Sequence, residues 1–462
     1  MAKNALLIFF LFAAPIIFLT AQEGTDSADG SAAQAALNAA EAARFATIKY
    51  GTETEIAALI TSLKNEGAEY LDDELIILVN GTRNQRILSG VFSFFAEREK
   101  AGLEERAMQA IIDRDIEASE TVLTAIDYLG KVKASQAEET LREVLDSGER
   151  RFMNISFKAL GRIGGTGRET GDSVAEYLVD YYTNREPGDE NRRDLIIAIG
   201  DTRSSIGVSF LSSIALDNDE RVPLRIAAIE AIGRTGNPDG LEAVLAGVSA
   251  SDPNIRSSAV AALGPFSGDN VDNTILEAFR DSFFRTRLAA ARASRERKLV
   301  AAIPYLKYRS ERDEVPQIKD EAIRALGAIG NSEAIDILNA LFVDRKSPDR
   351  VRMEAALALM QNAPDKYMAQ LVIELDDAKK NNMNSLYNGF LKVVGESHSN
   401  SHTDITRRFL QSGGIIEKSY GLDMAANNNL VNLSEEIKKV SEDRNESLAR
   451  KARRTMEKLG IE

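Results

Sequence analysis

The sequence predicts an all-α protein, an α-solenoid superhelix of about ten two-helix repeats. A short fragment recurs along the chain: Leu160-Gly161-Arg162-Ile163-Gly164 returns as Ile232-Gly233-Arg234-Thr235-Gly236 and as Leu326-Gly327-Ala328-Ile329-Gly330. Its first glycine, the anchor glycine, falls at residues 130, 161, 200, 233, 264 and 327, with one position skipped. Recurrence at a period of this size is typical of solenoids. The length of 462 residues also exceeds what one ordinary hydrophobic core can bury.

Each repeat is predicted to contain two helices, the second ending near the anchor glycine. Asp252-Pro253 is a helix start signal, because Asp is a good N-cap and proline fits the first helical position. The apolar residues that follow share one face at helical spacing: Ile255, Ala259, Val260 and Leu263. We expect the anchor glycine to sit just past the end of this helix.

The chain is expected to have three parts. Residues 1–21 have the basic tip and short apolar run of a signal peptide. Residues 22–51 are expected to be a flexible, Ala-rich linker or cap. Residues 52–462 form the solenoid, with the clearest repeats in 120–362 and irregular ones in 363–462. An uncleaved amino-terminal segment anchored in the inner membrane is the alternative to cleavage.

Composition narrows the possible functions. The net charge of −14 disfavours nucleic-acid binding, which requires positive charge. The absence of cysteine excludes disulfides and thiol chemistry, and in an exported chain it favours a bacterial periplasm. No membrane span is expected in the mature chain.

Enzyme signals are weak. The glycine-rich stretch 164–171 lacks the Lys-Ser/Thr ending of a phosphate loop. The two histidines, His398 and His402, lie in a segment that reads as a loop, although their spacing could suit a metal on a helix. We therefore expect no catalytic residue, no cofactor and no metal.

A basic residue recurs eight positions before the anchor. These residues are Arg192, Arg225, Arg256, Lys319 and Arg352, and acidic residues precede several of them: Asp219, Asp252 and Asp349. We interpret the series as a structural ladder of ion pairs between stacked units, and an anion-binding strip is the alternative.

One stretch departs from the acidic background and is the candidate protein-binding patch. Residues 285–298 contain six basic residues, Arg285, Arg287, Arg292, Arg295, Arg297 and Lys298, against one acidic residue. The patch coincides with the unit that lacks an anchor glycine. A solvated face without a partner is the alternative interpretation.

The anchors, the recurring arginine and the alanines between them resemble HEAT repeats, in particular the bacterial HEAT-like repeats of phycobilisome lyases. The resemblance implies a curved superhelix whose inner helices bind protein partners. It indicates an exported HEAT-repeat scaffold or adaptor that binds other proteins in the cell envelope and performs no catalysis. A lyase-like or other maturation enzyme on the same scaffold is the alternative. HEAT-type metal hydroxylases use His-Glu pairs, and this sequence contains no His-Glu dipeptide.

Overall fold

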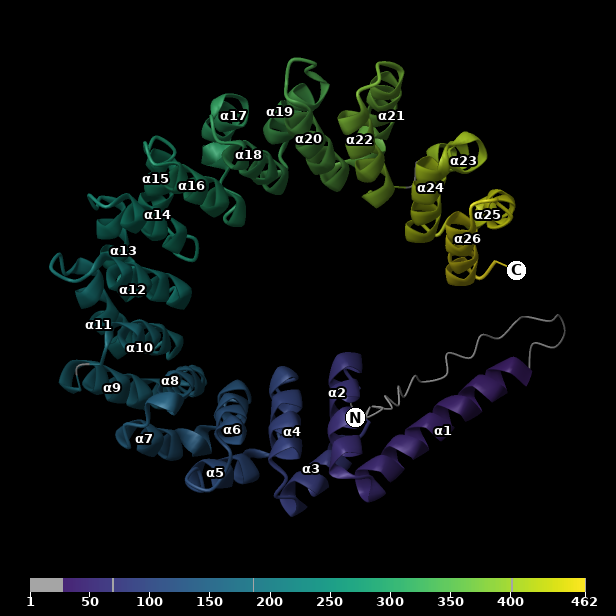
Figure 1. Ribbon diagram of the computed structural model, residues 1–462. Coiled ribbons are helices and arrows are strands. Elements are labelled where there is room, and N and C mark those ends of the chain that lie inside the picture. The colour runs from purple at the N-terminus through teal and green to yellow at the C-terminus, as the bar shows by residue number, and fades with distance from the viewer. Residues whose placement is uncertain (1–27, 69, 186, 400–401, 462) are drawn as a thin grey trace, which may run out of the picture. The chain divides into compact units, whose positions relative to one another are not determined.

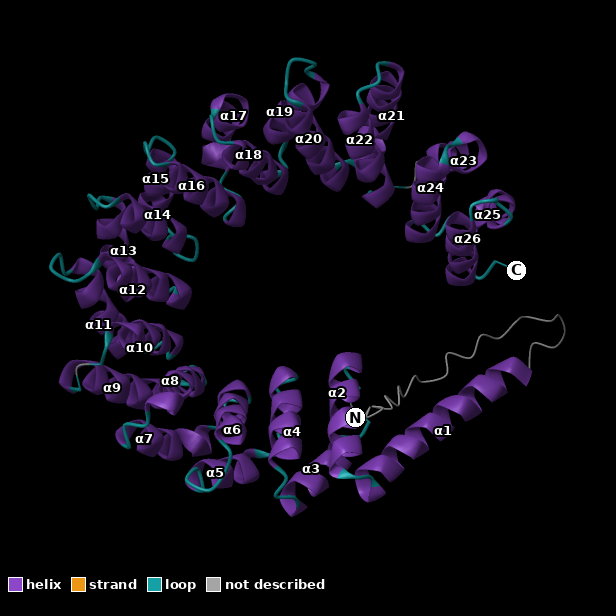
Figure 2. Cartoon of the chain, in the orientation of Figure 1, coloured by secondary structure: helices purple, strands orange, loops and turns teal. Residues whose placement is uncertain are grey.

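The computed structural model describes residues 28–461, apart from 69, 186 and 400–401. This part of the chain is built from helices joined by short turns and contains no strand (Figures 1 and 2). The predicted signal peptide lies outside the described residues. The chain divides into two compact units between Tyr128 and Leu129, a boundary that the sequence pattern did not indicate.

The first unit holds one long helix and the first helix pairs. Its helices are α1 (Ala28–Tyr50), α2 (Glu53–Glu66), α3 (Asp72–Gly81), α4 (Gln85–Glu97), α5 (Glu104–Ile112) and most of α6 (Ser119–Lys131). The expected linker or cap is therefore largely helical. The end of α1 packs on the first unit through an ion pair of 2.7 Å between Arg44 and Glu66 and a ring contact between Phe45 and Tyr70.

The described residues of the second unit form ten helix pairs in series. The first helices of the pairs are α7 (Glu138–Asp146), α9 (Arg168–Asn184), α11 (Ser205–Leu216), α13 (Leu241–Val248), α15 (Asp269–Ala278), α17 (Ile303–Arg312), α19 (Ser332–Val343), α21 (Pro364–Lys380), α23 (His402–Ser412) and α25 (Ser434–Ser441). The second helices are α8 (Arg150–Gly164), α10 (Asp189–Asp201), α12 (Val222–Thr235), α14 (Pro253–Ala262), α16 (Phe284–Glu296), α18 (Pro316–Ile329), α20 (Asp349–Asn362), α22 (Asn384–Glu396), α24 (Ile415–Asn427) and α26 (Glu446–Leu459). Short 3-10 turns precede four of the first helices, namely α7, α13, α17 and α25. These turns are η1 (Ser135–Ala137), η2 (Pro238–Gly240), η3 (Val300–Ala302) and η4 (Val431–Leu433).

Stacking within the second unit follows one rule. Each even-numbered helix contacts the next even-numbered helix, so α8 to α26 form one continuous layer, and the odd-numbered helices pack on it (Figure 1). Neighbouring pairs also share apolar contacts, as where Phe342 of α19 meets Phe390 of α22 in the next pair, with ring centroids 5.6 Å apart. The α-solenoid prediction is confirmed.

Helix start signals behave as the sequence indicates. In α14, Pro253 occupies the first turn and the Asp252 carboxylate accepts hydrogen bonds from the backbone N–H groups of Asn254 and Ile255, at 2.8 and 3.2 Å. These bonds satisfy donors that have no partner inside the helix.

One anchor glycine, Gly264, lies just past its helix as expected, since α14 ends at Ala262, but others do not. Gly200 and Gly233 lie inside the last turns of α10 and α12, not past them. Each of these helices ends after its anchor glycine. α12 ends at Thr235, and Gly236, with a φ of 61°, forms its left-handed C-cap. The anchor is small because the next helix comes very close: a Cβ added at Gly233 would lie 2.6 Å from the Cβ of Ala262.

Residues 364–459 form the last three of these helix pairs, α21 to α26, in the same order as the others. The asparagine-rich segment 381–384 forms the turn between α21 and α22, with Asn382 at a φ of 57°. Its composition reflects a left-handed turn position, which asparagine tolerates better than most residues.

Candidate protein-binding surface

Arg256, which was predicted to belong to the ladder, and Arg287, which was predicted to belong to the basic patch, form the same ion pair in successive units. The Arg256 guanidinium donates to both carboxylate oxygens of Asp281, at 2.8 and 3.2 Å, and to the carbonyls of Ala250 and Ser251. Arg287 contacts its own neighbours in the same way.

The Arg287 guanidinium donates to both oxygens of Asp313, at 2.8 and 3.1 Å, and to the carbonyls of Asp281 and Ser282. Each arginine thus closes its own loop and reaches forward to a carboxylate of the following unit. Such two-pronged arginine–carboxylate pairs are among the strongest hydrogen-bonded contacts in proteins.

The other ladder residues are variations on this contact. Arg352 pairs with Glu374 at 2.7 Å, with both side chains buried, and Arg192 lies 3.9 Å from Glu220. Lys319 donates to the carbonyl of Glu311 at 3.1 Å. The carboxylate partners lie 22 to 28 residues ahead of the arginines, so they differ from the preceding acids that the sequence suggested. Asp252, for example, caps α14.

The ladder also fixes the charge state of its acids. Burial alone would raise the pKa of the Asp313 carboxyl, but hydrogen bonds from Arg287 and from the backbone N–H of Val315 outweigh it and hold the pKa below its usual value. The same balance lowers the pKa of Asp281, with Arg256 and the backbone N–H of Phe283 as donors. Both carboxylates are therefore charged acceptors at neutral pH.

The structure divides the predicted basic patch into two groups. Arg287 belongs to the ladder. Arg295 pairs with Glu321 of α18 at 2.7 Å. Arg297 reaches back to Asp272 and to the carbonyls of Gly264 and Phe266. These three arginines hold neighbouring units together, and their charges are already neutralised or engaged.

The second group consists of Arg285, Arg292 and Lys298, which are exposed. Among the described residues none of the three has an ion pair or hydrogen-bond partner for its charged group. Arg285 and Arg292 are two helical turns apart on α16, and Lys298 follows the helix end. We call these three residues the α16 ridge. It presents three positive charges along about 20 Å of a chain with a net charge of −14, and the Arg285 guanidinium lies over the ring of Phe284, 5.8 Å from its centroid.

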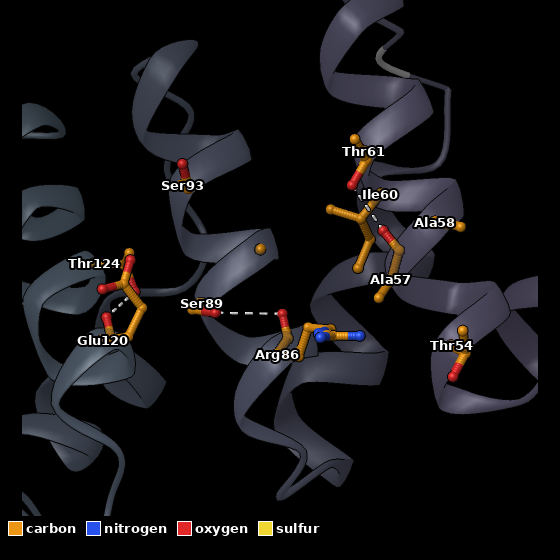
Figure 3. Close-up of a pocket in the computed structure, with 11 residues that line it drawn as sticks. Thr54, Ala57, Ala58, Ile60, Thr61, Arg86, Ser89, Ser93, Glu120 and Thr124 are labelled. Carbon is orange, nitrogen blue, oxygen red and sulfur yellow. Dashed lines mark hydrogen bonds between the residues drawn. The ribbon is translucent and has the colours of Figure 1, made fainter.

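A groove in the first unit offers shape but little chemistry. It has a volume of about 530 Å³ and lies across α2, α4 and α6 (Figure 3). Small and hydroxyl-bearing residues form most of its wall. The hydroxyls of Thr61 and Ser89 donate to the carbonyls of Ala57 and Arg86 in their own helices. Arg86 and Glu120 are the charged residues in its wall.

The two histidines differ in their exposure to solvent. His402 begins α23 and is buried, and burial lowers the pKa of its imidazole, whereas His398 is exposed. The Ser397 hydroxyl lies 2.8 Å from the carbonyl oxygen of Val394 and 2.9 Å from His402 Nε2. This contact links the start of α23 to the end of α22.

The remaining sequence candidates for chemistry are structural. Gly164 ends α8 and Arg168 begins α9, so the glycine-rich stretch is a turn between helices. Nowhere in the described part of the chain do three His, Asp or Glu side chains gather as a metal site would need. Among the described helices, none is both long enough and apolar enough to cross a membrane.

Comparison with protein families gives one match that extends over most of the chain. The family model described as "Spirochaete HEAT repeat protein" matches residues 48–455. A search of curated proteins found no match.

Comparison with solved structures gives matches of low sequence identity. Kap121p is 11% identical with a TM-score of 0.46, and the match covers 90% of this chain and 53% of that one. The chain thus spans about half the length of the Kap121p chains it matches. The CpcE–CpcF phycocyanin lyase complex of a Nostoc species is 18% identical with a TM-score of 0.30, covering 55% of this chain and 93% of that one. Human deoxyhypusine hydroxylase is 18% identical with a TM-score of 0.25, covering 58% and 96%.

Proposed function

Because the chain belongs to the spirochaete HEAT repeat protein family, we propose that it is a non-enzymatic scaffold that binds an acidic protein partner through the α16 ridge. The observation that carries the proposal is the division of the basic patch. Arg287, Arg295 and Arg297 serve the fold, whereas Arg285 and Arg292 are exposed on the same helix without an ion-pair partner among the described residues.

Two physical arguments support an acidic protein as the partner. Free positive charges on an acidic protein attract a complementary negative surface and speed the encounter between the two molecules. A stacked array of helix pairs also presents an extended surface along its length, which suits a protein ligand better than a small molecule.

Reversing the two exposed arginines should weaken partner capture without affecting folding. The variant Arg285→Glu with Arg292→Glu reverses two of the three ridge charges and breaks no ion pair among the described residues. We expect it to recover at least tenfold less partner from an envelope extract than the wild-type chain, at an unchanged melting temperature. Capture is measured by quantitative mass spectrometry.

The matched control is Arg83→Glu with Arg193→Glu, which makes the same charge change at two exposed positions away from α16. It should capture partner as the wild type does. Equal capture by the ridge variant and the wild type would contradict the proposal, as would an equal loss in the control.

We further propose that the scaffold acts in the cell envelope, after export directed by residues 1–21. The support is the sequence of that segment, in which an apolar run from Leu6 to Leu19 precedes a polar stretch. Amino-terminal sequencing of the native protein from the envelope fraction should give a start near Gln22. An intact Met1 on protein recovered from the cytosol would count against export.

A further inference from the structure

One step of the arginine ladder lacks its carboxylate. Arg225, Arg256 and Arg287 lie at equal intervals, since 256 − 225 and 287 − 256 are both 31. Asp281 lies six residues before Arg287 and pairs with Arg256 of the preceding unit. The residue six before Arg256 is Ala250, so the position that should supply a carboxylate to Arg225 carries a methyl group.

Arg225 keeps only part of the ladder contact. Its Nε donates to the carbonyl of Ala215 at 3.2 Å, and within the described residues no carboxylate lies at ion-pair distance. The side chain is half-buried. The Arg225 guanidinium is therefore partly removed from water and has N–H donors without a carboxylate partner. An ion pair formed there would be stronger than one on the open surface, because less water surrounds it.

A cavity occupies the place of the missing carboxylate. It has a volume of about 760 Å³ and lies between α11–α12 and α13–α14, with both Arg225 and Ala250 in its wall. Asn218, Ser249 and Ser251 add polar groups to the wall, and Leu216 and Val222 add apolar ones. Asp252 also lines the cavity, but its carboxylate accepts two backbone hydrogen bonds at the start of α14.

We propose that this cavity binds a carboxylate side chain from an acidic protein segment, which takes the place that Asp281 and Asp313 hold in the next two units. The Arg225 guanidinium would donate hydrogen bonds to this carboxylate, as Arg256 and Arg287 do in the ladder. Ser249 and Ser251, on either side of Ala250, add polar groups to the wall of the cavity. The exposed Leu216 beside it accepts an apolar neighbour of the acidic residue. The inference rests on the proposed scaffold function only in that the carboxylate comes from a protein.

The test uses a fluorescein-labelled peptide with one aspartate between two leucines, and the same peptide with asparagine in place of the aspartate. Fluorescence polarisation should show at least tenfold tighter binding of the aspartate peptide to the full-length wild-type chain. Ala250→Asp should abolish this preference, because the new carboxylate occupies Arg225 as Asp281 occupies Arg256. Arg225→Gln should abolish it by removing the cation.

Arg203→Gln removes one exposed positive charge elsewhere and is the charge-matched control. It should retain the preference, and so should the ridge variant Arg285→Glu with Arg292→Glu. Ala250→Asp should fold at least as stably as the wild type, which keeps the test valid if Arg225→Gln folds poorly. A wild-type chain with no preference for aspartate, an unchanged preference in Ala250→Asp, or an equal loss in Arg203→Gln would overturn the proposal.

The peptide assay and the capture assay test the two proposals independently of each other. Loss of capture in the ridge variant concerns the proposed function, and loss of aspartate preference in Ala250→Asp concerns the cavity. A cavity that binds the peptide in a chain whose capture is insensitive to the ridge would leave the inference standing and remove the ridge.

Discussion

Arg287→Gln should lower the free energy of unfolding by about 3 kcal/mol, because it leaves the buried carboxylate of Asp313 without its main partner. The Asp313 side chain is fully shielded from solvent, and Arg309, 3.3 Å away, replaces only part of the lost interaction. Arg285→Gln, two residues earlier on the same helix, should change stability by less than about 0.5 kcal/mol. Urea unfolding of the two variants measures the difference.

The pH dependence gives a second readout on the same contact. A carboxyl whose folded pKa lies below its unfolded value contributes stability above the unfolded pKa, which is about 4 for Asp, and this stability is lost as the pH falls through the folded pKa. The pKa of Asp313 is lowered in this way. The gap in stability between the wild type and Arg287→Gln should therefore narrow in acid. Equal stability of Arg285→Gln and Arg287→Gln at neutral pH would contradict the ladder.

Gly233→Val should destabilise the array by about 1–3 kcal/mol, because the anchor glycine is a contact point between helices. An added Cβ would lie 2.6 Å from the Cβ and 2.9 Å from the Cα of Ala262, so α12 and α14 would have to move apart. In a solenoid the damage should concentrate in the adjacent units, where hydrogen exchange should quicken most. Gly188→Ala is the control, since nothing lies within 4 Å of its added Cβ.

A double-mutant cycle separates this contact from other effects of the substitution. Gly233→Ala combined with Ala262→Gly removes one methyl group as it adds the other, and should cost less than the sum of the two single changes. The rescue should be partial, because the Ala262 Cα still lies close and glycine weakens a helix by about 1 kcal/mol. Strict additivity would show that α12 and α14 do not pack through these two residues.

The sequence predicted the architecture because stacking repeats its requirements. A small residue at every close helix contact, a start signal such as Asp252-Pro253 and an apolar stripe must recur wherever one pair packs on the next. The exact place of the anchor could not be predicted, because a glycine near a helix end suits either a C-cap or a close contact. In α12 these two roles fall to Gly236 and Gly233.

The site was harder to predict, because its meaning depends on which arginines are paired. The sequence pattern groups Arg287 with the basic patch and not with the ladder. Its unit lacks an anchor glycine, so the ladder position, eight residues before the anchor, could not be counted there. The equal spacing of Arg225, Arg256 and Arg287 was the signal that could have placed it. The partners Asp281 and Asp313 follow only from the loop geometry of the next unit, as does the gap left by Ala250.

The rate at which the captured partner associates with the chain, measured as ionic strength is raised, tests most directly whether the α16 ridge is the binding surface. The wild-type rate should be high at low salt and fall steeply as salt screens the exposed charges of Arg285 and Arg292. The rate for Arg285→Glu with Arg292→Glu should be low at every salt concentration and nearly flat. Superimposable salt dependences for the two proteins would contradict the account.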